Sequence, residues 1–264
     1  MINFSEFNGP KDFHVHTCFC DGENTPEEMI FAALDVGMNT IGFVAHSHTS
    51  FDECACASIE STDQYEEEVR TLDMAFGEQI DILCGIEQDY YSEEPTDRWD
   101  YVIGSVHYLP ERDCDPGEHL SFDDTEEMLQ QAIEEQYGGD AYSLCEDYYR
   151  LVADVVRKTN ADIIGHFDLV TKFNAGGENQ SAGKYFDEGD PRYVAAWQKA
   201  ADTLLETGKP FEINYGAVIS GRRTEPYPGP AIQKYLADRG AEFIFASDAH
   251  TVEALWAGAE INRK

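Results

Sequence analysis

Residues 12–16 read Asp12-Phe13-His14-Val15-His16, and this stretch decides how the rest of the chain is interpreted. Side chains alternate along a β-strand, so His14 and His16 are expected on the same face of one strand. Polar turn residues, Cys20-Asp21-Gly22, follow shortly afterwards. Two imidazoles on one face, where the chain leaves a strand, can bind one metal ion. Alone, such a pair is more often two ordinary histidines, so the interpretation depends on whether the pattern recurs.

The pattern recurs in six further segments that are predicted to be strands and that end at a polar, mostly ligand-type residue. These are residues 41–45 before His46, 81–86 before Glu87, 101–106 before His107, 162–165 before His166, 210–213 before Asn214, and 242–246 before Ser247-Asp248-Ala249-His250. Predicted helices separate most of them, beginning with a capping box at Thr25-Pro26-Glu27-Glu28. Alternating strands and helices, with strands apolar on both faces, predict an α/β fold with a parallel sheet.

The strand ends favour a closed or nearly closed α/β barrel of seven strands. In such barrels the carboxyl ends of the strands converge at one mouth, where the active site lies. An open doubly wound sheet is the alternative, and it would spread the same residues along a line. We expect a single domain over residues 1–264, with the irregular acidic segment 108–142 either a lid over the mouth or a plain surface loop.

The charge of the chain restricts its partners. The 52 acidic and 18 basic residues give a net charge of −34, which argues against nucleic acid as a partner. The same charge would repel a phosphorylated metabolite unless bound divalent cations supplied positive charge. No signal-peptide pattern is present, and no apolar run approaches the roughly 18 residues of a membrane span. We therefore expect a cytoplasmic protein that does not associate with membranes.

The seven cysteines are an odd number, and reduced thiols are expected. Cys18, Cys20, Cys54 and Cys56 form two C-x-C pairs, so a zinc site built from them is an alternative. It is the less favoured one, because structural zinc cysteines are usually spaced C-x(2–4)-C.

Six of the eight histidines lie at or just past a predicted strand end, together with three carboxylates. A rim crowded with imidazoles and carboxylates is costly unless cations lie among them. This mixture of ligands suits zinc, iron or manganese better than calcium. Because the candidates are too many for one ion, we infer two or three metal ions. The candidate ligands are His14, His16, Asp21, His46, Glu87, His107, His166, Asp248 and His250.

The motifs around these residues resemble the polymerase-and-histidinol-phosphatase (PHP) superfamily. They are His14-x-His16, Asp21-Gly22, Pro26-Glu27-Glu28, His46, Gly85-Ile86-Glu87, Gly104-Ser105-Val106-His107, Gly165-His166 and Ser247-Asp248-Ala249-His250. Longer strings resemble the monofunctional histidinol-phosphatases of this superfamily: residues 85–91, 164–169, Lys172-Phe173-Asn174, Phe211-Glu212-Ile213-Asn214 and Pro226-Tyr227-Pro228.

The resemblance implies a distorted (β/α)7 barrel with a trinuclear metal site. Carried over by motif, the first metal takes His14, His16, Glu87 and Asp248, and the second shares Glu87 and adds His107 and His166. The third takes His46, His250 and Asp21. The implied reaction is hydrolysis of a phosphomonoester, with L-histidinol phosphate of histidine biosynthesis as the substrate. Glu87 and Asp248 are the implied catalytic residues: Glu87 as the bridging ligand, and Asp248, or the third metal, as the group that assists the leaving alkoxide.

The substrate contacts are less defined by the sequence. Arg223 and Arg222 are the candidates for binding phosphate oxygens. Acidic and aromatic residues near Asp89, Tyr90, Tyr91 and Phe173 are candidates for the ammonium and imidazole groups of the substrate. Two positions depart from the family pattern, where an acid is expected at Ala45 and an arginine at Ser220.

Two other functions stay open. The first is a PHP phosphoesterase that acts on another small phosphomonoester or on a nucleotide. The second is a non-catalytic PHP module of the kind fused to polymerases. The intact set of candidate ligands argues against the non-catalytic module.

Overall fold

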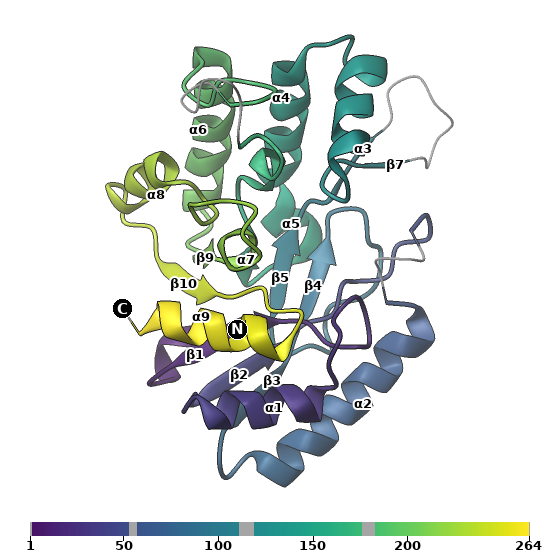
Figure 1. Cartoon of the computed structure of the whole chain (residues 1–264), viewed down its shortest axis with the longest axis vertical. Helices are drawn as coiled ribbons and strands as arrows, with labels where there is room; N and C mark the ends of the chain where they lie inside the picture. Colours follow the sequence, from purple (N-terminus) through teal and green to yellow (C-terminus); the bar gives the residue numbers. More distant parts are fainter. Residues whose placement is uncertain (1, 53–56, 111–118, 176–182, 264) are drawn as a thin grey trace.

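The computed structural model describes residues 2–52, 57–110, 119–175 and 183–263 (Figure 1). Two parallel sheets form its centre. One has the order β1-β2-β3, with β1 at Lys11–Val15, β2 at Thr40–Phe43 and β3 at Asp81–Cys84. The other has the order β10-β9-β8-β5-β4, with β4 at Ile86–Asp89, β5 at Val102–Ser105, β8 at Ile163–Ile164, β9 at Phe211–Asn214 and β10 at Phe243–Ala246. The predicted α/β class with parallel strands is therefore confirmed.

The strands do not form one continuous ladder. The third predicted strand is divided at Gly85, because β3 pairs with β2 whereas β4 pairs with β5. Isolated parallel bridges link the two sheets where Val15 meets Ala249 and where His46 meets Glu87. Val15 ends β1, and His46 and Ala249 lie three residues beyond the ends of β2 and β10, whereas Glu87 lies within β4. The carboxyl ends of β1, β2 and β10 therefore meet at the junctions between the sheets.

Tyr101 explains why the division falls at a glycine. Its side chain is fully buried, and its hydroxyl donates to the carbonyl oxygens of Phe13 at 2.6 Å and Phe43 at 3.1 Å. A Cβ atom at Gly85 would lie 2.5 Å from the Tyr101 ring, and one at Gly42 would lie 2.5 Å from its hydroxyl. Only glycine at these two positions leaves room for the ring.

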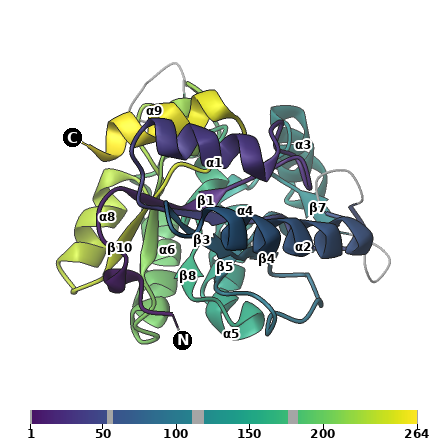
Figure 2. The ribbon, with the colours of Figure 1, turned by 90° about the horizontal axis from the view of Figure 1, so that it is seen from below.

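Helices α1 (Pro26–Asp35), α2 (Ile59–Phe76) and α9 (Val252–Asn262) pack beside the three-stranded sheet, and α1 and α9 lie side by side (Figures 1 and 2). The capping box that joins Thr25 and Glu28 is present at α1, as predicted. The sequence predicts an acidic helix over residues 62–76 with Met74 on its inner face, whereas α2 begins three residues earlier, at Ile59. Met74 is instead 81% exposed.

The remaining helices lie beside the five-stranded sheet. They are α3 (Glu126–Gln131), which continues as a π-helical segment at Ala132–Gln136, α4 (Ala141–Val152), α5 (Val155–Thr159), α6 (Pro191–Leu205), α7 (Gly216–Ile219) and α8 (Pro230–Ala237). The sequence predicts a helix from Ser143, with Glu146 in a capping box, to about Lys158. Helix α4 instead starts after Asp140, whose side chain accepts from the Ser143 amide. Strands β6 (Tyr108–Pro110) and β7 (His119–Ser121) form an antiparallel pair that the sequence does not predict.

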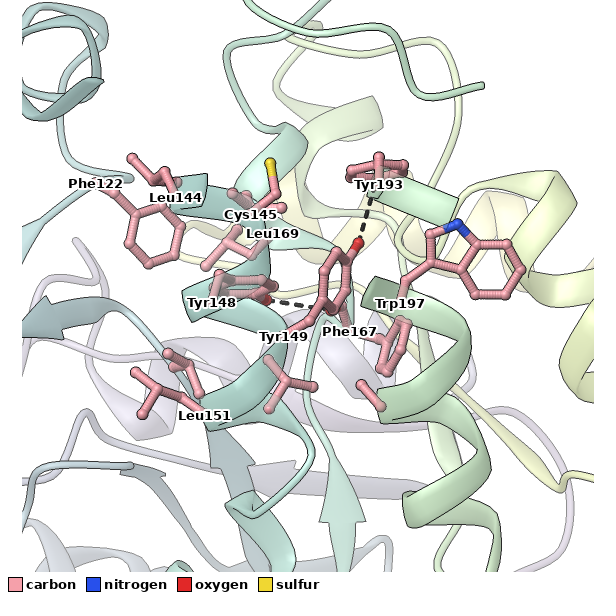
Figure 3. Close-up of a cluster of buried hydrophobic side chains, with 14 of the residues drawn as sticks. Phe122, Leu144, Cys145, Tyr148, Tyr149, Leu151, Phe167, Leu169, Tyr193 and Trp197 are labelled. Atoms are coloured by element: carbon pink, nitrogen blue, oxygen red, sulfur yellow. Dashed lines mark hydrogen bonds between the residues drawn. The ribbon is translucent and has the colours of Figure 1, made fainter. Parts of the chain in front are cut away.

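An aromatic core joins α4 to α6 (Figure 3). Its members include Tyr148, Tyr149, Phe167, Tyr193 and Trp197, and the hydroxyls of Tyr149 and Tyr193 lie 2.9 Å apart. Phe167 follows His166 directly, so this core fixes the chain just beyond the end of β8. Across the described ranges, we find no helix that is both long and apolar enough to cross a membrane.

Candidate metal centre

The nine side chains predicted as ligands lie together at the carboxyl ends of the strands. His14 on β1 and His16 just beyond it approach each other at their Nε2 atoms, 3.0 Å apart. Oε2 of Glu87 lies 3.4 Å from each of these two nitrogens. Oδ1 of Asp248 lies 3.5 Å from His14 Nε2 and 3.4 Å from His16 Nε2. Two imidazoles and two carboxylates therefore converge on one point.

Glu87 is the centre of the cluster. Its Oε1 atom lies 2.9 Å from Nε2 of His166 and 3.4 Å from Nε2 of His107, and these two imidazole nitrogens are 3.3 Å apart. Its Oε2 atom lies 3.0 Å from Nδ1 of His46. Glu87 is buried on β4, so its carboxylate faces imidazoles on both sides and little solvent.

Asp21 completes the outer side of the cluster. Its Oδ1 atom lies 3.6 Å from Nε2 of His46, and its Oδ2 atom lies 3.1 Å from Nε2 of His250. The ring of His16 stacks on those of His46 and His250, with centroids 4.5 and 4.3 Å away. The Asp21 side chain is 38% exposed, so this part of the cluster is the most open to solvent.

Three groups within this cluster have ligand atoms that all lie within 4.8 Å of one another. They are His16, Asp21, His46 and His250; His14, His16 and Asp248; and His46, Glu87 and His107. The cluster is therefore suited to several metal ions.

The hydrogen bonding of His14 tests whether a cation fits. Its Nδ1 atom donates to the buried carboxylate of Glu212 at 2.6 Å. In a neutral ring this leaves a lone pair on Nε2, which faces Nε2 of His16 at 3.0 Å. Two lone pairs at that distance repel each other unless a proton or a cation lies between them. The donor set therefore fits a divalent metal ion.

The electrostatics of the metal-free cluster agree with this fit. Burial favours neutral imidazoles, but Glu212, Asp248 and Glu87 outweigh it and raise the pKa of His14 well above its ordinary value. Glu87 likewise raises the pKa of His107, to about 10. The surrounding histidines hold the pKa of Glu87 well below its usual range, although burial alone would raise it. Protons on the imidazoles thus balance the carboxylates where cations would otherwise do so.

Asp248 has a left-handed backbone conformation, with φ at +54°. Side chains other than glycine adopt this conformation at some energetic cost, although aspartate tolerates it better than most. Gly216 leaves room for the Asp248 side chain, because a Cβ atom at position 216 would lie 2.9 Å from the Cβ atom of Asp248. Strain of this kind is often retained at functional sites, where it directs one side chain.

Glu212 was not recognised as a site residue from the sequence. Besides its bond to His14, its Oε2 atom accepts from the backbone amide of His166 at 3.0 Å and from Nδ2 of Asn214 at 3.3 Å. The Asn214 amide also donates to Asp248 at 3.2 Å. A carboxylate inside the apolar strand Phe211–Asn214 was the available signal, because a buried charge needs a partner.

Asp89 positions another candidate ligand. It accepts from the backbone amide of His107 at 2.9 Å, and its Oδ2 atom also lies 3.3 Å from Nδ1 of that ring. The sequence suggested Asp89 as a contact for the substrate ammonium, but these bonds commit its carboxylate to His107. Tyr91, suggested for the same purpose, packs against the ring of His119 with centroids 3.9 Å apart.

The two arginines proposed for phosphate binding lie in different environments. Arg223 donates from Nη1 to the carbonyl oxygen of Thr171 at 2.8 Å and to its hydroxyl, and its guanidinium lies 5.0 Å from the centre of the Tyr227 ring. Arg222 is exposed. Within the described ranges, neither arginine forms a hydrogen bond or ion pair with the nine candidate ligands.

The two departures from the family pattern and the cysteines remain to be described. Ala45 is fully buried, and the hydroxyl of Ser220 donates to the Ala217 carbonyl. Cys54 and Cys56 lie outside the described residues, so the four-cysteine alternative is not tested. Cys18 and Cys20 are free thiols, and Sγ of Cys20 lies 3.4 Å from Nδ1 of His16.

The fold and the cluster define an α/β protein whose strand ends carry a group of imidazoles and carboxylates suited to several metal ions. The chain belongs to the PHP domain family, whose sequence pattern residues 12–216 match.

Two curated relatives are named probable histidinol-phosphatase. The protein from Deinococcus radiodurans is 31% identical, over 90% of this chain and 85% of its own length. The protein from Schizosaccharomyces pombe is 25% identical, over 91% of this chain and 80% of its own length.

Two solved structures share the fold. A putative histidinol phosphatase from Listeria monocytogenes has a TM-score of 0.79 at 19% identity and covers 95% of this chain and 99% of its own. Histidinol phosphate phosphatase from Lactococcus lactis was solved with zinc, L-histidinol and phosphate. It has a TM-score of 0.65 at 20% identity, and the match covers 96% of this chain and 91% of its own.

Proposed function

We propose that this protein is a metal-dependent phosphomonoesterase that hydrolyses L-histidinol phosphate to L-histidinol and phosphate, a reaction of histidine biosynthesis. The observation that carries the proposal is the cluster around Glu87, where imidazole and carboxylate atoms from strands far apart in sequence converge within hydrogen-bonding distance. Membership of the PHP domain family supports the reaction class, and the two relatives named probable histidinol-phosphatase support the substrate.

The proposed metal centre holds two or three ions of zinc, iron or manganese. His14, His16, Glu87 and Asp248 would hold the first, Glu87, His107 and His166 the second, and His46, His250 and Asp21 the third. Bound there, divalent cations would lower the pKa of water and stabilise the charge that develops on the phosphoryl group. Glu87 is the proposed shared ligand, because its two oxygens face different imidazoles.

Asp248 is proposed as a ligand and not as the source of the proton for the leaving group. Its Oδ1 atom faces His14 and His16, and its Oδ2 atom accepts from Asn214. Burial would raise its pKa, but His14 and its neighbours hold that pKa well below the usual range, so the carboxylate carries no proton at neutral pH. Its part in the reaction is then to bind metal and to stabilise positive charge.

We also propose that the two sheets complete a distorted seven-stranded barrel and that residues 1–264 are one PHP domain. The isolated bridges at Val15–Ala249 and His46–Glu87 support closure at the rim. Cys18, Cys20, Cys84 and Cys145 are free thiols, which supports a reducing compartment such as the cytoplasm. The acidic surface disfavours nucleic acid as a partner.

The test is a substrate panel on the metal-loaded protein, with metal content determined on the same sample. The panel contains L-histidinol phosphate, phosphoserine, a nucleoside monophosphate and p-nitrophenyl phosphate. The proposal predicts that kcat/KM for L-histidinol phosphate exceeds the others by at least about 100-fold. Similar values for all four would assign a less specific PHP phosphoesterase, and a fully metallated protein that cleaves none of them would be a non-catalytic module.

A further inference from the structure

Tyr227 presents a buried hydroxyl without a hydrogen-bond partner. The residue is 3% exposed, and among the described residues no donor or acceptor meets its hydroxyl oxygen. A buried hydroxyl left unpaired destabilises the folded state, so its retention calls for an explanation. A ligand that accepts a hydrogen bond there would supply one.

Backbone hydrogen bonds tie Tyr227 to Asn214, a residue that contacts the candidate ligand Asp248. The amide of Asn214 donates to the Tyr227 carbonyl at 2.7 Å, and the amide of Tyr227 donates to the Asn214 carbonyl at 2.9 Å. Asn214 ends β9, and its side chain bonds both Glu212 and the candidate ligand Asp248. The position of Tyr227 is therefore tied to the same network that positions the candidate ligands.

The ring of Tyr227 is also held from one side. The guanidinium of Arg223 lies 5.0 Å from the ring centre, and Arg223 is itself bonded to Thr171. Arg223 thus makes no direct contact with the candidate ligands but orients a side chain that lies near them. The phosphate-binding function expected of Arg223 from the sequence is in this view exerted through Tyr227.

The charged groups around Tyr227 are Arg223, the carboxylates of Asp168 and Asp123, and the candidate ligand Asp248. Asp123 pairs with Lys172 at 3.0 Å, and Asp168 lies close enough to Arg223 for their charges to interact. Burial raises the pKa of Tyr227 above its ordinary value, Arg223 opposes this, and Asp168, Asp123 and Asp248 add to it. At neutral pH the hydroxyl therefore keeps its proton and can act as a donor.

We propose that the Tyr227 hydroxyl donates a hydrogen bond to a phosphoryl oxygen of the substrate bound at the metal centre. This inference rests on the proposed phosphomonoesterase function and adds a substrate-binding residue to it. A phosphoryl oxygen is the expected acceptor because the hydroxyl is a neutral donor on a ring that faces Arg223, a cation that favours an anion nearby. The backbone of Tyr227 is bonded to Asn214, whose side chain contacts Asp248. Asp123 is paired with Lys172 at 3.0 Å, and the charge of Arg223 offsets part of the charge of Asp168.

The test compares the metal-loaded wild-type protein with Tyr227→Phe. Two quantities are measured: the affinity for inorganic phosphate by titration calorimetry, and kcat/KM for L-histidinol phosphate. We expect both to fall roughly 10- to 100-fold, as for the loss of one hydrogen bond to a charged group. Bound metal should be unchanged, and the melting temperature should not fall, since the substitution removes an unpaired hydroxyl.

The matched control is Tyr193→Phe, which removes a buried hydroxyl that is paired with Tyr149 (Figure 3). It should lower the melting temperature and leave phosphate affinity unchanged. If Tyr227→Phe binds phosphate as tightly as the wild type, the inference is wrong, and the hydroxyl holds no more than a water molecule, for example one shared with Asp168.

The inference and the proposed function can fail separately. If the wild-type protein cleaves L-histidinol phosphate and Tyr227→Phe matches it in both measurements, only the inference fails. If no monoester is cleaved but Tyr227→Phe weakens phosphate binding, only the proposed function fails.

Discussion

The Nδ1 atom of His14 lies 2.6 Å from Oε1 of Glu212, and both side chains are closed to solvent. This bond fixes the proton of His14 on the side away from the candidate metal centre. The other Glu212 oxygen accepts from the His166 amide, so one carboxylate orients two candidate ligands on different strands. Partners of this kind set the orientation and basicity of metal-binding histidines.

We therefore expect Glu212→Gln to weaken metal binding by about 10- to 100-fold while the fold is kept. The amide preserves the size of the side chain but removes the charge that holds the His14 proton. Zinc affinity measured by competition with a chelator checks this, with circular dichroism as the check on folding. Glu206→Gln, an exposed carboxylate just after α6, is the matched control and should bind zinc normally. Equal affinities in the two variants would refute the positioning role of Glu212.

Glu87 should be indispensable, because its oxygens face imidazoles of all three proposed metal positions. Glu87→Gln is expected to lower kcat for the phosphomonoester by at least about 1,000-fold, equivalent to about 4 kcal/mol in the activation barrier. It should also lower the number of metal ions bound per chain, which elemental analysis reports. A variant with full metal content and normal turnover would remove the shared-ligand assignment.

Metal binding should compete with protons. The pKa of His107 in the metal-free protein is about 10, and those of His14, His16 and His46 are raised well above their ordinary value. At pH 7 protons therefore reside on these imidazoles, with at most one of them between His14 and His16, and they must leave before cations bind. Zinc affinity should therefore rise with pH, by up to about tenfold per pH unit for each proton released.

Calorimetric titration of zinc into metal-free protein, in two buffers with different ionisation enthalpies, counts the protons released. More than one proton per chain is expected at pH 7. An enthalpy independent of the buffer, with an affinity independent of pH between 6 and 8, would contradict the expected competition.

The sequence was most informative about the candidate metal ligands, because histidines and carboxylates recur at the ends of its predicted strands. Ligand-type residues at the ends of predicted strands brought nine positions into a single hypothesis, and the structure places those side chains together. Their binding of metal stays a prediction. Glu212 escaped notice, and Asp89 was assigned to the substrate instead of to His107, because each contact depends on which nitrogen of a distant histidine the carboxylate faces. No local pattern in the sequence encodes such a contact.

The division of the third predicted strand was hidden for a similar reason. Residues 81–86 form one apolar run, and nothing in that run shows that pairing changes from β2 to β5 at Gly85. The change depends on Tyr101, which fills the space between the sheets. The N-cap of α4 was predicted at Ser143 but is Asp140. Both residue types are good N-caps, so the sequence does not show which of the two caps the helix.

Gly85→Ala tests the packing at this division. The new methyl group would lie 2.5 Å from the Tyr101 ring, which cannot move away without breaking its bonds to Phe13 and Phe43. We expect a loss of roughly 1–3 kcal/mol in the free energy of unfolding, measured by urea denaturation. Gly189→Ala, where a Cβ atom would meet only the exposed Asp187 side chain at 3.2 Å, should change stability little. Equal stabilities would show that the ring tolerates the methyl group.

Salt should stabilise this protein. A net charge of −34 makes the folded state repel itself, and α2 carries Glu66, Glu67 and Glu68 in succession with Asp63 one turn before Glu67. The screening length falls from about 10 Å at 0.1 M salt to about 3 Å at 1 M, so added salt weakens this repulsion. We expect the melting temperature to rise by on the order of 5 °C between 0.05 and 1 M KCl.

Glu67→Lys is the matched variant, because Glu67 is exposed and its side chain forms no ion pair within the described ranges. Replacing one negative charge by a positive one should raise the melting temperature at low salt and reduce its dependence on KCl. Chloride is preferred to sulfate in this experiment, since sulfate stabilises most proteins by strengthening the burial of apolar surface. A melting temperature that is constant from 0.05 to 1 M KCl in both proteins would show that repulsion among the acidic side chains does not limit stability.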